Sequence, residues 1–244
     1  MSGRHDRHLA LPGFGAAQLG RLRAASALVV GAGGLGAPVL TYLAAAGVGR
    51  LVIVDDDVVE EANLSRQVLF AADAGGRSKA AAAAERVRAL NPAVEARAVA
   101  ARLGADNVAA LVAVADVVVD CSDNPPTRYR LNRAALAAGR PLVWGAIAQF
   151  CGRCAVTPAG RGPCWECLFG PQEQLSGWPT AAADGVFGPV CGVVGAWAAA
   201  ETVKVITGLG DPLVSRMLLV DALTGETLVI PVQADPDCPA CGRR

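Results

Sequence analysis

The chain has 244 residues, 53% hydrophobic and 18% charged, which suits one large domain or two small ones with a well-buried core. Its 22 basic and 22 acidic residues cancel, so nothing indicates a basic surface for nucleic acid. The uncharged run 185–200 is too short and too rich in glycine and proline to predict a membrane span, and no signal-like apolar segment follows the N-terminus. We therefore expect a cytoplasmic protein, in which eight cysteines indicate metal binding or catalysis before disulfides.

Buried-type strands alternate with helices through the first half of the chain. The predicted strands cover 26–31, 51–54, 94–99, 116–121 and 141–144. The predicted helices run from Gly36 to Gly47 and over 78–90, 105–114 and about 125–138. Pro92 marks the end of the second helix, because proline cannot continue one. This alternation predicts an α/β fold, Rossmann-like and doubly wound, with a mostly parallel sheet and helices on both faces.

The pattern changes after Gly145. We predict an extended strand over 147–156 and a loop without clear period over 159–184. A long apolar helix is predicted over 187–207, and a hairpin around Thr224-Gly225 over 218–232. A loop of that length in a compact domain is usually functional or mobile. We expect one domain over 1–244, comprising an N-terminal arm (1–25), a nucleotide-binding half (26–157) and a part with the loop, long helix, hairpin and tail (158–244). The last part is expected to add a C-terminal antiparallel extension to the sheet.

A glycine-rich turn joins the first strand to the first helix. Gly31, Gly33 and Gly36, with Gly34 between them, fit the G-x-G-x-x-G pattern, and Asp55 follows Gly36 by 19 residues, where a ribose-binding acid belongs. The glycines let the backbone approach phosphate, and the helix N-terminus supplies donors. The turn therefore predicts a nucleotide site, but it does not choose between NAD and ATP.

Polar and basic residues beyond the turn favour ATP. Asn63, Arg66 and Gln67 follow the acidic strand end, and Lys79 opens the alanine-rich helix. A hydride-transfer site does not need such cations, whereas a site that breaks a triphosphate does, because charge shifts onto the leaving pyrophosphate. Asp123 at the end of its strand is then placed to hold Mg²⁺. The alternative is that the cations are solvated surface charges and that Asp123 caps the next helix.

Taken together, these motifs resemble the MoeB/ThiF/HesA family, bacterial relatives of ubiquitin-activating enzymes. The similarity extends from about Arg4 to Cys241. It rests on GAGGLG at 31–36, VDDD at 54–57, NLSRQ at 63–67, Lys79, DCSDN at 120–124, Arg128, Leu131-Asn132 and paired cysteines.

The resemblance implies an enzyme that uses MgATP to adenylate the C-terminal glycine of a small ubiquitin-like sulfur carrier ending in Gly-Gly, of the molybdopterin or thiamine type, with release of pyrophosphate. It implies that Asp55 binds the ribose, that Asp123 serves the metal, and that Asn124 lies beside it in the nucleotide site. The residues implied for the phosphates are Asn63, Arg66, Gln67 and Lys79. It also implies a homodimer in which an arm arginine, Arg7 or alternatively Arg4, reaches the partner's ATP site.

This chemistry accounts for the scarcity of histidine. The chain has two histidines, His5 and His8, and neither is near a motif. A C-terminal carboxylate, with a pKa of about 3.3 to 3.7, is already ionised at neutral pH and needs no general base. It needs positioning and neutralisation of charge around the α-phosphate.

Three cysteine pairs have C-x-x-C spacing, namely Cys151/Cys154, Cys164/Cys167 and Cys238/Cys241. Four thiolates make a closed tetrahedral zinc site. The first pair lies in a predicted strand, where positions i and i+3 point to opposite faces and chelate poorly. The resemblance places a structural zinc on the other two pairs, and the alternative is a redox or disulfide function.

Some members of the family carry a further cysteine in the crossover loop that takes part in sulfur or thioester transfer. The matching position falls near Ala181, and 178–183 contains no cysteine. Cys191 lies in an apolar helix, where packing is the simpler interpretation. We therefore expect a purely adenylating enzyme that passes its product to a separate sulfurtransferase, an expectation that the end of the chain soon after Cys241 supports. The alternatives are an NAD(P)-dependent oxidoreductase and a non-catalytic nucleotide-binding scaffold.

Overall fold

The computed structural model describes residues 3–160, 162–172 and 181–242, and within this part eight strands form one sheet in the order β3-β2-β1-β4-β5-β6-β7-β8. Strands β1 to β5 are parallel, and β6 to β8 continue the sheet antiparallel. This architecture confirms the predicted α/β fold with a C-terminal antiparallel extension. The strands are β1 (Ser26–Val30), β2 (Arg50–Val54), β3 (Glu95–Val99), β4 (Val117–Asp120), β5 (Leu142–Ala148), β6 (Cys151–Thr157), β7 (Arg216–Asp221) and β8 (Glu226–Pro231).

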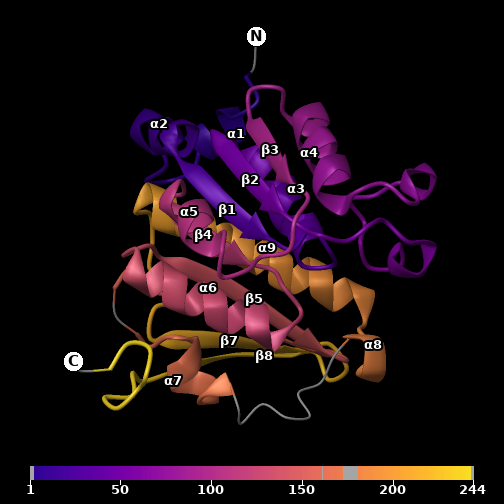
Figure 1. The fold of residues 1–244 in the computed structure, drawn as a ribbon. Helices are drawn as coiled ribbons and strands as arrows, with labels where there is room; N and C mark the ends of the chain where they lie inside the picture. Colours follow the sequence, from indigo (N-terminus) through magenta and orange to yellow (C-terminus); the bar gives the residue numbers. More distant parts are fainter. Residues whose placement is uncertain (1–2, 161, 173–180, 243–244) are drawn as a thin grey trace.

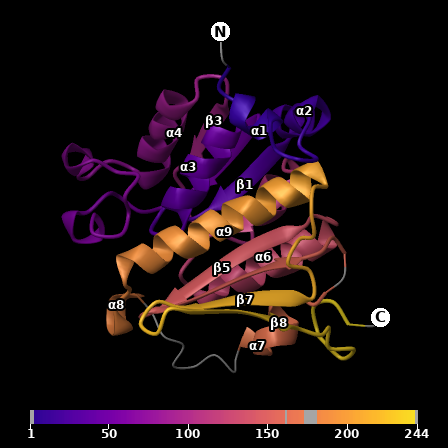
Figure 2. The same cartoon turned by 180° about the vertical axis from the view of Figure 1, so that it is seen from behind.

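Helices cover both faces of the sheet (Figures 1 and 2). Helices α2, α3, α4 and α9 pack on one face around Leu40 and Leu43, whereas α5, α6 and α7 pack on the other around Leu131 and Trp144. The helices are α1 (Asp6–Leu9), α2 (Ala16–Ala24), α3 (Gly36–Ala46), α4 (Lys79–Leu90), α5 (Val108–Ala113), α6 (Pro125–Ala137), α7 (Trp165–Phe169), α8 (Ala181–Asp184) and α9 (Gly188–Thr207), with 3-10 turns at Glu61–Asn63 and Ala72–Ala74.

Helix α9 is long and apolar enough, by length and composition alone, to cross a membrane. In the fold it crosses the sheet beside α3 and over β5 and β6 (Figure 2). Val194 and Ala198 on its inner side are buried in the core. Its packing is therefore that of a core helix, and it ends at Gly208, as the sequence predicted, in a left-handed conformation.

The prediction of one strand over 147–156 is wrong, because the chain reverses at Gln149. Strands β5 and β6 meet there in an antiparallel hairpin. Gln149 has a φ of 52°, a left-handed value that non-glycine residues seldom adopt. Its N–H donates to the carbonyl of Gly185 at 3.2 Å, and its carbonyl accepts from Phe187 N–H at 2.9 Å. Contacts with a segment distant in the sequence therefore hold this turn.

Two further segments differ from the prediction. The helix expected over 105–114 begins only at Val108, because the Asn107 side chain shapes the turn before it, accepting from Gly104 N–H at 3.0 Å and donating to the Arg102 carbonyl at 2.9 Å. The loop expected over 159–184 contains α7 and α8, and its residues 173–180 lie outside the described part.

The glycine turn is set by close backbone contacts. Gly31 has a φ of 91°, and a Cβ atom there would lie 2.7 Å from the carbonyl oxygen of Cys121. A Cβ atom at Gly36 would overlap the carbonyl oxygen of Gly31. Only glycine therefore allows α3 to start this close to the end of β1.

We expect Gly36→Ala to lower the free energy of unfolding by about 1–3 kcal/mol, since the added methyl group forces the turn apart. The matched control is Gly20→Ala in α2, where a Cβ atom would meet nothing within 4 Å. This control should raise stability by about 0.5–1 kcal/mol, because alanine favours a helix. Denaturant unfolding measures both, and equal stability of the two variants would contradict the assigned contact.

Candidate active site

An open pocket lies at the carboxyl ends of β1, β2 and β4. The strand order reverses between β1 and β4, and ligands of open α/β sheets bind in the crevice at such a point. The predicted residues that line the pocket are Gly31, Gly33, Gly34, Asp55, Arg66, Gln67, Lys79, Asp123 and Asn124. Residues from five separate parts of the sequence are thus brought to one place.

Four predicted residues do not line this pocket. Gly36 lies in the glycine turn but does not face the pocket. Asn63 contacts a pocket residue, because its Oδ1 accepts from Arg66 Nη2 at 2.7 Å. Arg4 and Arg7 are exposed on the N-terminal arm. The arm packs through His5 against Gly47, at the end of α3 opposite to the glycine turn. The arm arginines are therefore far from the pocket of their own chain.

Asp55 holds the glycine turn against the end of β2. Its carboxylate accepts from Ala32 N–H at 2.7 Å and from Asp57 N–H at 2.9 Å. Burial raises the pKa of Asp55, and the two hydrogen bonds offset part of that rise. The side chain lies between the turn and the pocket, where it can also meet a ligand hydroxyl.

Lys79 is not a solvated surface charge. Its side chain is only 6% exposed, and Nζ lies 2.8 Å from Oδ2 of the exposed Asp57. Arg66 is half-buried, and its Asn63 partner fixes the guanidinium. Both cations line the pocket beside the glycine turn, in a lining that also holds several carboxylates, Asp57 and Asp123 among them.

Gln67 offers an open hydrogen-bonding position. The residue is 4% exposed and lines the pocket, and among the described residues its Oε1 has no hydrogen-bond partner. A buried amide oxygen without a partner is costly unless a ligand or water satisfies it. Gln67 therefore fits a pocket that holds a polar ligand.

Asn124, not Asp123, caps helix α6. Its Oδ1 accepts from Thr127 N–H at 3.1 Å, and Pro125 occupies the first helical position. The alternative interpretation of Asp123 as a cap is thus wrong. Asp123 is exposed at the pocket, which leaves its carboxylate available to a cation.

Arg128 is a pocket residue that the sequence marked only as part of a motif. It is buried, donates to the carbonyls of Ser122 and Gly145, and lies 3.8 Å from the buried carboxylate of Asp120. Asp120 also accepts from the Ser122 hydroxyl at 2.6 Å. Arg128 therefore ties the ends of β4 and β5 together at the floor of the pocket.

Two thiols line the pocket, those of Cys121 and Cys191, and Cys191 lies in α9. It is buried, as predicted, and lies against Gly34. Burial is the largest effect on this thiol and raises its pKa, while Arg66 acts in the opposite direction. A thiol with a raised pKa is a poor nucleophile at neutral pH.

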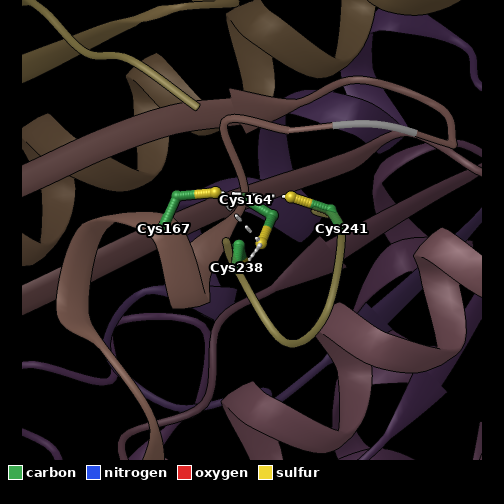
Figure 3. A group of neighbouring side chains, drawn as sticks. All are labelled: Cys164, Cys167, Cys238 and Cys241. Atoms are coloured by element: carbon green, nitrogen blue, oxygen red, sulfur yellow. Dashed lines mark hydrogen bonds between the residues drawn. The ribbon is translucent and has the colours of Figure 1, made fainter. Parts of the chain in front are cut away.

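Four cysteines form a second site, at the end of the sheet where the C-terminal tail meets α7 (Figure 3). Their sulfur atoms all lie within 4.8 Å of one another, with Cys164 3.7 Å from Cys238 and Cys167 3.3 Å from Cys241. Tetrahedral zinc with Zn–S bonds of 2.3 Å requires sulfur atoms about 3.8 Å apart. The four side chains therefore fit a closed structural zinc site.

The other cysteines agree with this assignment. Cys151 is exposed and Cys154 is buried, on opposite faces of β6, so they do not form a chelating pair. All eight cysteines lie in the described residues, and each is free. Both observations argue against the disulfide interpretation.

A Rossmann-like fold with a glycine turn, cations at the crevice and a four-cysteine cluster is typical of ATP-dependent activating enzymes. The sequence matches the ThiF family over residues 5–240, and the chain belongs to this family. The family resemblance is thereby confirmed.

Relatives point to adenylyl transfer. The chain is 47% identical to a sulfur carrier protein adenylyltransferase of Thermus thermophilus, covering 98% of this chain and 90% of that protein. It is also 47% identical to the SAMP-activating enzyme E1 of Haloferax volcanii, covering 98% and 88%. Bovine adenylyltransferase and sulfurtransferase MOCS3 is also 47% identical, over 99% of this chain. This chain spans about half, 53%, of the length of the bovine protein. These relatives confirm the prediction of an adenylyltransferase.

The fold itself matches that of Escherichia coli MccB. A crystal structure of MccB with MccA-N7isoASN aligns with a TM-score of 0.86 at 23% identity, over 99% of this chain and 74% of MccB. At this identity the likeness shows the fold.

We expect Cys164→Ser to lose bound zinc and to unfold at a lower temperature, because a structural zinc site contributes directly to folding. Wild type should hold about one zinc ion per chain by elemental analysis. Cys151→Ser is the control, since this exposed thiol lies outside the cluster, and it should keep both the zinc and the unfolding midpoint. Full zinc content in Cys164→Ser would refute the ligand assignment.

Proposed function

We propose that this chain activates a ubiquitin-like sulfur carrier ending in Gly-Gly by adenylating its C-terminal glycine with MgATP. The observation that carries the proposal is the buried Lys79 beside Arg66 at a glycine turn, in a chain whose relatives are named adenylyltransferases. A nicotinamide carrier has no use for two cations beyond its pyrophosphate, and that alternative leaves them unexplained. One adenylyltransferase domain over 1–244 suits a sheet whose strands come from both 26–157 and 158–244.

In the proposed reaction the carrier's carboxylate oxygen bonds to the α-phosphorus of ATP. The bond from that phosphorus to the bridging oxygen breaks, and pyrophosphate leaves with the negative charge. Lys79 and Arg66 stabilise this charge, and backbone N–H groups of the turn at Gly33 and Gly34 approach the phosphates. Asp123 would hold Mg²⁺, which supplies further neutralisation of the phosphates.

The other pocket residues position the nucleotide. Asp55 offers its carboxylate to the ribose while it fixes the turn. Asn63 orients Arg66. Gln67 offers the N–H groups of its amide to the phosphates, which leaves the unpartnered Oε1 for a donor of the ligand or for water. The two histidines lie on the arm, which suits a nucleophile that is ionised without a base.

ATP–pyrophosphate exchange, measured with one candidate carrier at a time, tests the reaction. We expect exchange that depends on a single carrier, and we expect Asp123→Ala to reduce it to background while its unfolding midpoint stays that of wild type. Asp73→Ala is the matched control, because Asp73 is an exposed aspartate outside the pocket. ATP binding without exchange for any carrier would instead favour the scaffold function, and full activity of Asp123→Ala would refute its role.

We further propose a homodimer in which each arm completes the partner's site. Arg7 is exposed and far from its own pocket, so it can reach an ATP site only in a second copy. Tyr42 on α3 and Val193 and Trp197 on the adjacent α9 are 55%, 44% and 41% exposed, which offers an apolar surface to that copy.

Mixing two inactive variants tests the arm. Arg7→Ala and Asp123→Ala should each be inactive alone. After subunit exchange at equal amounts the mixture should recover about a quarter of wild-type exchange, because half the dimers are mixed and each has one intact site. Arg4→Ala in the same experiment decides between the two arginines. No recovery would show that the arm does not complete the partner's site, and full activity of Arg7→Ala alone would show that Arg7 is not needed.

The adenylated carrier would pass to a separate sulfurtransferase in the cytoplasm. Eight free cysteines suit a reducing compartment. The position expected to match the transfer cysteine of some family members falls near Ala181 at the start of α8, and the neighbouring 178–180 lie outside the described residues.

A further inference from the structure

The floor of the nucleotide pocket and the four-cysteine site share one helix. Arg128 and Asn132 lie one turn apart on α6, so their side chains leave the same face of the helix. Arg128 lines the pocket, whereas Asn132 Nδ2 lies 3.5 Å from the sulfur of Cys164. Helix α6 thus touches both sites.

Trp165 joins these two side chains. Its indole ring lies under the Arg128 guanidinium, with Cζ 4.8 Å from the ring centroid, and its backbone N–H donates to Asn132 Oδ1 at 3.1 Å. The residue is 1% exposed, and Trp144 meets it edge-on at 5.0 Å. A ring on the guanidinium face leaves the N–H groups in its plane free to donate to the Ser122 and Gly145 carbonyls.

The cysteine site is one of the features that hold Trp165 in place. The residue directly follows Cys164, and Cys167 comes one turn later in α7. A helix of five residues is not stable alone in water, so its position depends on what anchors it. Its anchors include the cysteine cluster and Glu166, which is fully buried and pairs with Arg133 at 2.8 Å. Tyr129 adds a further anchor, because its hydroxyl donates to the carbonyl of Gly170 at 2.7 Å.

We propose that Trp165 is a positioning residue that transmits the state of the four-cysteine site to the nucleotide pocket, so that loss of the metal weakens nucleotide binding. The inference rests on the proposed nucleotide site. When α7 loosens, the ring leaves the guanidinium, and the loop from Ser122 to Asn124 loses its support. Asp123, the proposed magnesium ligand, lies in that loop. Loss of the loop's support should therefore lower the affinity for MgATP.

Calorimetric titration with MgATP in the absence of carrier tests the proposal. Trp165→Leu should bind MgATP about tenfold more weakly than wild type, while zinc content stays unchanged. Trp165→Phe keeps an aromatic face and should retain most of the affinity. The control is Val112→Ala, which removes methyl groups from the same apolar cluster and should lower stability without changing the dissociation constant.

Zinc removal by a chelator completes the test, with folding followed by circular dichroism. The dissociation constant should rise in wild type and change little in Trp165→Leu, because the link is already broken there. Equal affinity of zinc-loaded Trp165→Leu and wild type would overturn the inference. So would an equal response of both proteins to zinc removal, or equal losses in the Leu and Phe variants. No MgATP binding by wild type would overturn the proposed function as well.

Discussion

The reversal of strand order between β1 and β4 is the constraint on which the rest of the structure depends. Strands β2 and β3 extend the sheet from β1 in one direction, and β4 and β5 extend it in the other. The segments that leave β1 and β4 therefore part and open a crevice, in which Gly31 touches the backbone of Cys121. Substrate-facing residues can come only from segments that end at this edge, which is why Lys79 and Asp123 meet there although they are far apart in the sequence.

The sequence predicted what depends on short-range patterns. Buried strands were evident as apolar runs, and the glycine turn with Asp55 is a local motif with a steric cause. The hairpin at Gln149 was missed because its turn carries no glycine, proline or asparagine and is held instead by Gly185 and Phe187. The cap of α6 could have been predicted from the sequence, because Pro125 favours the first helical position and so makes Asn124 the capping residue.

Local sequence patterns could not predict which charged side chains are buried. Lys79 is surrounded by alanines in an apparently exposed helix, and it is buried because Asp57, 22 residues earlier, lies across from it. Arg128 is buried for a similar reason, since its partners Asp120 and Gly145 belong to two strands. Such charges remain ionised only where partners or a ligand offset the loss of water. Both Lys79 and Arg128 line the pocket, and each meets its protein partner there before any ligand arrives.

The antiparallel extension gives the C-terminal tail its place in this arrangement. Strands β7 and β8 return the chain beside β6, and the tail beyond Pro231 then reaches α7. Ligands 74 residues apart, Cys164 and Cys238, become neighbours there. The free-energy cost of closing a loop grows only slowly with its length, about 0.6 kcal/mol for each doubling, so one metal ion bound to this cluster would suffice to fix a long segment. Because the tail meets α7 at this cluster and α7 carries Trp165 under Arg128, the last residues of the chain lie next to the elements that support a pocket built mainly by the first half.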